Sequence, residues 1–431
     1  MDLLVSSLLN AVSGMGQGFA AFLDVWFIVL PPLLYGIFLL LWMQYVWGKW
    51  ASNVKWMLLE IIPPRDIEKS PQPMESIFAG LAGVIASPTA IEEYIKGFIP
   101  VSFSLELVST EGMVHFYLRT QAQFRNLVEA HFYAQYPDVE IIEVADYVQA
   151  IPRTIPNKDW DLWGTDFELT KDDLYPIRTY KFFEESVTGK MIDPVSGLVE
   201  TMGKLGPGQH LWLQFITTPL GEAATRKALA GTVDKFLGKE KPEEIGVFRM
   251  FFMDLWDVIR NLPAGVLASE PDFYSYKQEK KDEQPLEFRL TPGEKDILKA
   301  LQANLGKQQY RVRMRMVYLG RREGFSKTVV SSFIGGIKQF SDQNMNGFKP
   351  NDASKTYANY VMTQERLRFR QRRIFQRYVS RDSTPQETRF ILSSEEMATI
   401  FHLPDMSVVA PTMMRVSAKR GNAPANLPIQ E

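Results

Sequence analysis

Cysteine is absent from this sequence of 431 residues. Its absence excludes disulfide bonds, thiolate metal sites and cysteine nucleophiles together, and it fits a reducing compartment. The chain is 45% hydrophobic and 23% charged, as is typical of a folded protein. Its length leaves room for a membrane segment and two or three domains.

Motifs for catalysis and metal binding are missing as well. The four histidines, His115, His131, His210 and His402, do not stand at the spacing of a metal-binding pair. The nearest approach to a phosphate-binding loop is 320–328, but its glycines are too close and Phe-Ser separates the second one from lysine. The segment therefore predicts a strand-to-helix turn. We expect no catalytic residue, cofactor or metal; an enzyme of unfamiliar type is the weaker alternative.

Charge is unevenly distributed, although the formal net charge is only −2. Residues 300–431 contain 21 Lys and Arg against 10 Asp and Glu, whereas residues 1–299 contain 27 against 40. This asymmetry indicates that the last third of the chain meets an acidic partner, either a nucleic acid or an acidic protein surface.

One long apolar run stands out near the N-terminus. Residues 25–47 carry no charge over 23 positions, which is enough for a helix to cross a bilayer core of about 30 Å. Its aromatic residues are expected to anchor it at the two membrane interfaces. The anchor residues are Trp26, Trp42, Tyr45 and Trp47.

The charges that flank this run predict its orientation. Asp2 and Asp24 precede it, whereas Lys49, Lys55 and Arg65 follow it. The positive-inside rule then places residues 1–24 outside the cytoplasm and the large C-terminal part inside it. We expect a single-pass protein of the inner (cytoplasmic) membrane with its helix at 25–50.

The remaining pattern predicts an α+β fold in two domains, each an antiparallel sheet with helices, and in the first domain the helices are expected to pack on one face of the sheet. A connector with an amphipathic or interfacial helix at 74–86 is expected over 51–100. The first domain covers 101–275, with a hairpin (102–108 and 113–119), a helix (121–136), strands (139–144, 178–184 and 210–217) and helices (221–237 and 247–262). A linker (276–290), a second domain (291–410) and an extended tail (411–431) follow.

In the second domain, helices are expected at 291–305 and 326–340 and strands at 310–318 and 373–379. The last helix, within 392–404, has a clear start. Ser393 stands three residues before Glu396, which is the spacing of a capping box.

Arginines alternate with apolar residues in two segments of this second domain. If both segments are extended, the arginines of each share one face and the apolar residues share the other. Two such ribbons side by side form a basic face that can hold phosphates; the alternative is a solvated face paired with acidic side chains across strands. The candidate residues are Arg311, Arg313, Arg315, Arg366, Arg368, Arg370, Arg372 and Arg373.

Several short segments resemble a bacterial family. They are 56–64, 71–75, 134–141, 392–404 and 425–428, and none is a catalytic motif. Their order is similar to the membrane-anchored N-terminal region that precedes HerA/FtsK-type ATPases in conjugation and type IV secretion-like systems. The resemblance implies a P-loop ATPase subunit as partner and a homo-oligomeric assembly. It departs from the family in that no nucleotide-binding domain follows.

These observations lead to one main hypothesis and one rival. The main hypothesis is a non-enzymatic, membrane-anchored module of a translocation machine, which docks a cytoplasmic hexameric ATPase. The rival is a membrane-tethered protein that binds nucleic acid through the arginine-rich strands.

Overall fold

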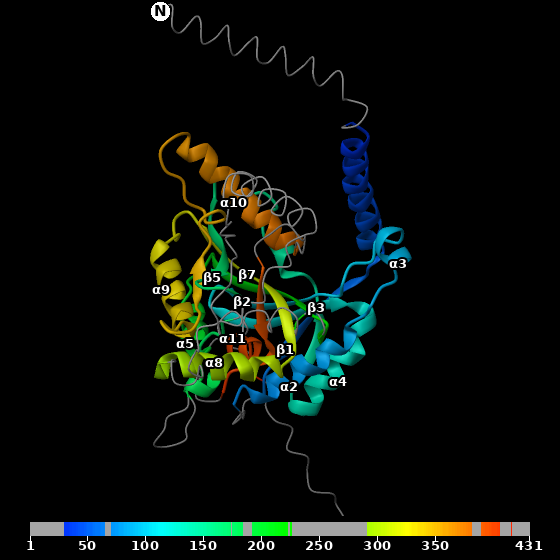
Figure 1. Cartoon of the computed structure of the whole chain (residues 1–431). Helices are drawn as coiled ribbons and strands as arrows, with labels where there is room; N and C mark the ends of the chain where they lie inside the picture. The colour runs from blue at the N-terminus through cyan, green and yellow to red at the C-terminus, as the bar shows by residue number, and fades with distance from the viewer. Residues whose placement is uncertain are drawn as a thin grey trace, which may run out of the picture. The chain divides into compact units, whose positions relative to one another are not determined.

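Within the residues that the structure describes, strands from both halves of the chain pair in one nine-stranded sheet (Figure 1). The structure, a computed structural model, describes residues 30–64, 70–173, 175–183, 192–222, 225, 291–381, 389–405 and 415. The strand order is β4-β1-β3-β2-β6-β7-β5-β8, with β9 beside β7. The strands are β1 (Trp56–Ile62), β2 (Phe103–Thr110), β3 (Met113–Gln121), β4 (Glu140–Val144), β5 (Trp160–Leu169), β6 (Gln209–Pro219), β7 (Gln309–Arg321), β8 (Phe348–Pro350) and β9 (Phe390–Ser393).

This sheet confirms the α+β class and joins the two expected domains. The long strand β7, from the second expected domain, pairs with β6 on one side and with β5 and β9 on the other, always antiparallel. Strands β5 and β6 belong to the first expected domain. The two predicted sheets are therefore one sheet, because β7 of the second expected domain forms hydrogen bonds with β5 and β6 of the first.

The predicted hairpin at 102–119 is confirmed as β2 and β3. Its two turn residues, Glu111 and Gly112, both have positive φ angles, 54° and 90°. This is the backbone of a type I′ turn, whose twist matches that of the paired strands. Glycine at the second position permits the left-handed conformation at little cost.

Helices cover both faces of the sheet, so the prediction of helices on one face is corrected. Alternation along β6 sends Trp212 to one face and Phe215 to the other. Trp212 contacts Tyr378 of α10, whereas Phe215 contacts Phe401 just after α11. In Figure 1, α10 lies above β5 and β7, and α2, α4 and α11 lie together below. The helices are α2 (Gln72–Leu81), α4 (Arg125–Gln135), α5 (Ser196–Gly203), α8 (Pro292–Leu305), α9 (Lys327–Ile337), α10 (Thr363–Ser380) and α11 (Ser394–Ile400).

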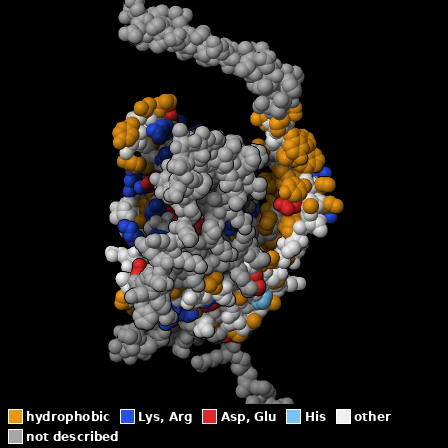
Figure 2. All heavy atoms as spheres, in the orientation of Figure 1, with side chains coloured by type: hydrophobic (Ala, Val, Ile, Leu, Met, Phe, Trp, Pro, Cys, Tyr) orange, Lys and Arg blue, Asp and Glu red, His pale blue; other side chains and the backbone are white. Residues whose placement is uncertain are grey.

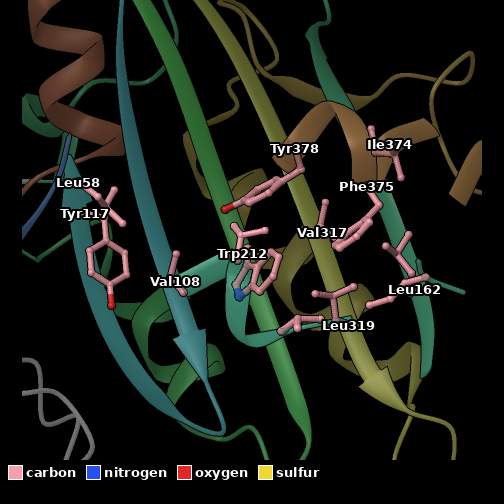
Figure 3. Close-up of a cluster of buried hydrophobic side chains, with 13 residues drawn as sticks. Leu58, Val108, Tyr117, Leu162, Trp212, Val317, Leu319, Ile374, Phe375 and Tyr378 are labelled. Atoms are coloured by element: carbon pink, nitrogen blue, oxygen red, sulfur yellow. The ribbon is translucent and has the colours of Figure 1, made fainter. Parts of the chain in front are cut away.

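The apolar core under α10 fixes the position of that helix (Figure 3). Ile374, Phe375 and Tyr378 of α10 are buried against Trp212 of β6 and residues of its neighbours. Each large apolar side chain removed from water contributes about 1.5–3 kcal/mol. The strand residues of this cluster include Val108, Tyr117, Leu162, Val317 and Leu319.

The structure decides two predictions between residues 51 and 100. The expected connector is corrected, because it contains β1, an inner strand between β4 and β3. The helix predicted as amphipathic or interfacial is α2, and it is amphipathic, with Met74, Ile77 and Phe78 buried. Phe78 packs edge-on against Tyr310 of β7, with ring centroids 6.0 Å apart. The apolar side of α2 therefore faces the protein core rather than a membrane.

Other expected elements have different outcomes. The strand expected at 178–184 is a 3₁₀ turn, Tyr180–Phe183. The segment 320–328 is the strand-to-helix turn between β7 and α9, as predicted, and Ser326 caps α9 by accepting from the Thr328 amide. The helices predicted at 221–237 and 247–262, the linker at 276–290 and nearly all of the tail lie outside the described residues.

A second compact unit consists of the apolar helix and a short segment at 86–101. The helix Leu30–Asn53 has 24 residues and is the one helix of the described part that is long and apolar enough to cross a membrane. Trp42, Tyr45 and Trp47 lie in its second half. Trp26 lies outside the described residues.

The predicted capping box at the start of α11 is confirmed, and a second one starts α8. Ser393 accepts from the Glu396 amide, and the Glu396 carboxylate accepts from the Ser393 amide at 2.7 Å. Thr291 and Glu294 form the same pair at an exposed site.

We expect Ser393→Ala to lower the free energy of unfolding by about 1–2 kcal/mol, and Thr291→Ala by about 0.5–1 kcal/mol. The loss is larger at the buried Ser393 because water cannot replace the lost hydroxyl there. Chemical denaturation of the two variants checks this order. Equal losses would contradict the role given to burial.

Candidate binding groove on helix α10

The arginine-rich segment 366–373 is helical, which corrects the prediction of an extended ribbon. It forms the middle of α10, and the strand predicted at 373–379 is the end of the same helix. The apolar residues that decide this are Ile374, Phe375 and Tyr378, which recur at helical spacing and are buried together. The alternation of arginine with Leu367 and Phe369 is too short to outweigh that pattern.

The other predicted ribbon is a strand, but it is not a solvated basic face. Arg313 and Arg315 of β7 are 2% and 0% exposed, while Arg311 is exposed. The Arg315 Nε lies 2.7 Å from the Asp166 Oδ1, and these residues are cross-strand partners in β7 and β5. For Arg315 the structure thus matches the alternative of acidic partners across strands.

One acidic residue links the two arginine-rich segments. The second oxygen of Asp166 lies 3.8 Å from an Nη of Arg377 on α10. The carboxylate therefore stands between a buried arginine of the sheet and a partly buried arginine of the helix. The structure brings the segments together through this ion pair rather than as adjacent ribbons.

Four arginines of α10 line a groove of 460 Å³. They are spaced so that they form one stripe along the helix. The opposite wall comes from Ala353 and Ser354, and Glu365 is the one acidic residue in the lining. We call this the α10 groove. Its arginines are Arg366, Arg370, Arg373 and Arg377.

Hydrogen bonds hold the opposite wall of the groove in place. The Arg370 Nη1 donates to the carbonyl oxygens of Lys355 and Tyr357, at 3.0 and 2.6 Å. The Ser354 hydroxyl accepts from the Asp166 amide of β5 at 2.8 Å. Arg370 is thus partly structural. Arg366 and Arg373 are exposed, although Arg366 also donates to the Asn359 carbonyl at 3.1 Å.

Large apolar side chains are exposed beside the groove, at the start of α10. Phe369 lines the groove and is 65% exposed, and Tyr360 is 94% exposed. Tyr360 and Met362 have φ angles of 71° and 49°, a left-handed backbone that such residues rarely adopt. Figure 2 shows orange and blue side chains side by side at upper left, where α10 begins. Exposed apolar groups among cations are typical of a binding surface.

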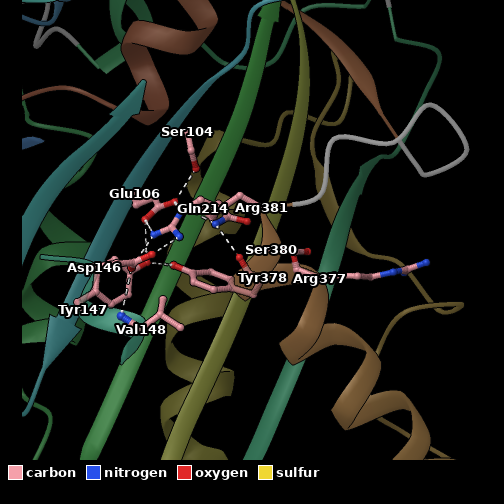
Figure 4. A network of polar contacts seen from close by, with 10 residues as sticks. All are labelled: Ser104, Glu106, Asp146, Tyr147, Val148, Gln214, Arg377, Tyr378, Ser380 and Arg381. Atoms are coloured by element: carbon pink, nitrogen blue, oxygen red, sulfur yellow. Dashed lines mark hydrogen bonds and ion pairs between the residues drawn. The ribbon is translucent and has the colours of Figure 1, made fainter. Parts of the chain in front are cut away.

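A buried polar network fixes the far end of α10 (Figure 4). Arg381, the C-cap of α10, forms two hydrogen bonds with Glu106 of β2, at 2.6 and 3.0 Å. It forms two more with Asp146, at 2.7 and 3.0 Å. Both Glu106 and Arg381 are buried. A bidentate pair in such surroundings is strong and sets the direction of both side chains.

Two tyrosines and one glutamine complete this network. The Tyr147 hydroxyl donates to Glu106 at 2.8 Å and lies 2.7 Å from the Tyr378 hydroxyl. Gln214 of β6 donates to Glu106 at 3.0 Å. Burial raises the pKa of Tyr147 and of Tyr378 well above the ordinary value, so both hydroxyls stay protonated. The network locks α10 onto the sheet and thereby positions the groove.

A second cavity, of 880 Å³, contains charges of both signs. Lys181 lies 2.7 Å from Glu395, and Lys307 lies 3.6 Å from Glu75 and also pairs with Glu395. Because these charges neutralise one another, the cavity has no clear preference for an anion or a cation. The α10 groove is the better candidate site.

Two of the four histidines pair with carboxylates. His115 pairs with Glu60 at 2.6 Å, and His402 lies 3.1 Å from Asp193. Among the described residues, no group of three His, Asp or Glu side chains is placed to hold a metal ion.

The comparison with known families gives one match that runs across both expected domains. The model of the family described as "Domain of unknown function (DUF8128)" matches residues 53–416. The chain belongs to the DUF8128 family. The match spans both expected domains of this DUF8128 chain, just as the sheet does. No curated protein matches the sequence.

Proposed function

We propose that this protein is a membrane-anchored, non-enzymatic docking module of a translocation machine, and that its α10 groove binds an acidic surface of a cytoplasmic ATPase subunit. The observation that carries the proposal is the stripe of four arginines lining one groove, with a single glutamate among them. The resemblance of the sequence to regions that precede HerA/FtsK-type ATPases suggests the class of partner.

The composition of the groove favours a protein as its partner. Arginine and aromatic residues are enriched in protein interfaces, and a few of them supply most of the binding energy. Arg366, Phe369 and Arg373 are exposed within a few residues of one another on a helix. Since the Arg381 network holds that helix rigidly, little entropy is lost when a partner binds.

Photo-crosslinking in cells tests this docking. A photoreactive amino acid replaces Phe369, and the crosslinked protein is identified by mass spectrometry; we expect a P-loop ATPase subunit. Arg366→Gln with Arg373→Gln should lower the crosslinking yield several-fold, because both arginines line the groove. Failure to crosslink an ATPase subunit would refute the proposal.

The matched control is Arg368→Gln with Arg372→Gln. These arginines are exposed on the same helix but do not line the groove. The control removes the same charge, so it should leave the yield nearly unchanged. An equal loss in both variants would mean that net charge, rather than the groove, attracts the partner.

We further propose that the helix Leu30–Asn53 crosses the inner membrane and leaves the sheet-containing body in the cytoplasm. Its length and hydropathy support the anchor. Lys49 and Lys55, at its C-terminal end, support the orientation. The aromatic residues Trp42, Tyr45 and Trp47 suit an interface.

A reporter fused to the C-terminus tests the orientation. A reporter that is active only in the cytoplasm should be active, and one that requires export should be silent, because the basic flank keeps this side inside. Exchanging Lys49 and Lys55 for Glu should weaken that preference. An active export reporter in the unaltered chain would reverse the orientation.

Nucleic-acid binding is the second candidate function. Tyr360 and Phe369 are exposed beside the groove arginines, and aromatic rings next to cations are a platform on which bases stack. The dependence of binding on salt distinguishes this function from docking of an acidic protein.

A further inference from the structure

The segment 86–101 carries an exposed apolar surface of its own. Its helix α3 (Ala90–Tyr94) begins with a capping box, in which Thr89 accepts from the Glu92 amide. Ile91, Tyr94 and Ile95 are 61%, 54% and 61% exposed. They stand at positions i, i+3 and i+4, which form one side of a helical turn, whereas Glu92 and Glu93 point elsewhere.

This segment lies along the second half of the helix Leu30–Asn53, within the same compact unit. The Trp42 indole donates to the Tyr94 carbonyl at 2.8 Å, and the Trp50 and Phe98 rings are 6.1 Å apart. Gly97, with φ of 71°, lies against the Val46 backbone so closely that a side chain there would clash. Three separate contacts therefore hold the segment to the apolar helix.

The position of these contacts along the helix Leu30–Asn53 fits the boundary between a membrane and water. Lys49 is the first charged residue after the apolar run, and Trp42 precedes it by seven positions. Trp42 therefore lies about 10 Å from Lys49 along the helix axis, towards the apolar middle of the helix. Interfacial helices bury their apolar face about 5–10 Å into the headgroup and acyl boundary. Glu92 of α3 pairs with local groups, namely Thr89 and, at 3.8 Å, Lys96.

We propose that α3 is a second membrane contact, which inserts Ile91, Tyr94 and Ile95 into the lipid interface beside the transmembrane helix. This inference rests on the proposed membrane anchor. Its occupant is lipid because α3 is joined to the apolar helix by the hydrogen bond from Trp42 to the Tyr94 carbonyl. The residues of that helix at this level, Leu41, Trp42 and Tyr45, are exposed as well. Figure 2 shows hydrophobic side chains, in orange, gathered at upper right.

The absence of native cysteine makes a direct test possible. Single cysteines replace Ile91, Ile95 or, as matched control on the same helix, Glu93. Each full-length variant is labelled with an environment-sensitive fluorophore and reconstituted in liposomes of neutral and anionic phospholipids. Labels at Ile91 and Ile95 should be quenched by nitroxide lipids and be several-fold less sensitive to aqueous iodide than the label at Glu93.

Labels at two further positions test the membrane contact of α3 separately from the transmembrane anchor. Leu34 reports on the transmembrane helix, and Lys349 reports on the sheet-containing body. If Leu34 is shielded from iodide while Ile91 and Ile95 are as accessible as Lys349, the anchor stands and the inference is wrong. If Leu34 is also accessible, both fail. Shielding of Ile91 and Ile95 without nitroxide quenching would indicate a protein partner and would also refute the inference.

Discussion

Replacing Arg381 by methionine should lower the free energy of unfolding by about 3–5 kcal/mol, the usual cost of removing one partner of a buried ion pair. The loss arises because Glu106 would remain buried without its bidentate partner, while Asp146 would lose two hydrogen bonds. Methionine keeps much of the volume, so packing changes contribute little. Urea denaturation of the full-length chain in detergent measures the change.

Two controls show whether the charge is the cause. Arg372→Met removes an exposed arginine from the same helix, and such a change is expected to cost less than about 0.5 kcal/mol. Combining Arg381→Met with Glu106→Gln should be less destabilising than the sum of the two single changes, because the glutamine carries no charge. An additive result would contradict the account of an unpaired buried carboxylate.

The pairing of Arg381 with Asp146 makes the stability of the protein depend on pH. Burial alone raises the pKa of the Asp146 carboxyl, but its hydrogen bonds and attraction to Arg381 more than offset this, so the pKa is lowered from its ordinary value. A carboxyl with a lowered folded-state pKa stabilises the protein above its unfolded-state value, and this stability is lost as the pH falls through the folded-state value. The difference in unfolding free energy between the unaltered chain and Arg381→Met should therefore be largest at neutral pH and should shrink as the pH falls through the folded-state pKa of Asp146, which urea denaturation at a series of pH values measures.

Local signals in the sequence predicted many of the elements correctly. The turn at Glu111 and Gly112, the capping box of Ser393 and Glu396, and the strand containing Arg311 are all present. Each depends on a few neighbouring residues, so a short window contains the whole cause. For 366–370 a short window gave the wrong prediction of a strand, because the residues that show helical spacing, Ile374, Phe375 and Tyr378, lie outside it.

The single sheet depends on distant pairing, which no local window contains. Arg315 of β7 pairs with Asp166 of β5, 149 positions away. Nothing near either residue specifies the other, and two sheets of four or five strands fit the same patterns. One signal was overlooked: Glu106 stands in an otherwise apolar strand, FSLELVST. A charge at such a position predicts a buried partner, which is Arg381.

Because the groove follows from this pairing, its residues were only partly predictable. Four of the eight predicted arginines are groove-lining or buried beside Asp166: Arg315, Arg366, Arg370 and Arg373. Arg377 joins them only because α10 lies on the sheet. Arg368 and Arg372 lie elsewhere on the helix, which makes them controls rather than ligands.

Salt should separate the two candidate functions by a large factor. If the four groove arginines contact nucleic-acid phosphates, the logarithm of affinity falls with the logarithm of salt with a slope of about −3.6. Raising salt from about 50 to 200 mM then weakens binding roughly 100-fold. An acidic protein partner releases no condensed counterions, and screening of exposed pairs worth about 0–1 kcal/mol each gives a smaller change.

The groove variant, Arg366→Gln with Arg373→Gln, tests whether this salt dependence arises from the groove. Fluorescence anisotropy with a double-stranded DNA oligonucleotide and with a glutamate-rich peptide gives the salt slope for each. For DNA bound in the groove, Arg366→Gln with Arg373→Gln should reduce the slope by about 2, because two phosphate contacts are lost. The Arg368→Gln and Arg372→Gln control should leave it unchanged. If DNA binds with the same slope in all three chains while the peptide loses affinity only in the groove variant, the groove serves a protein partner.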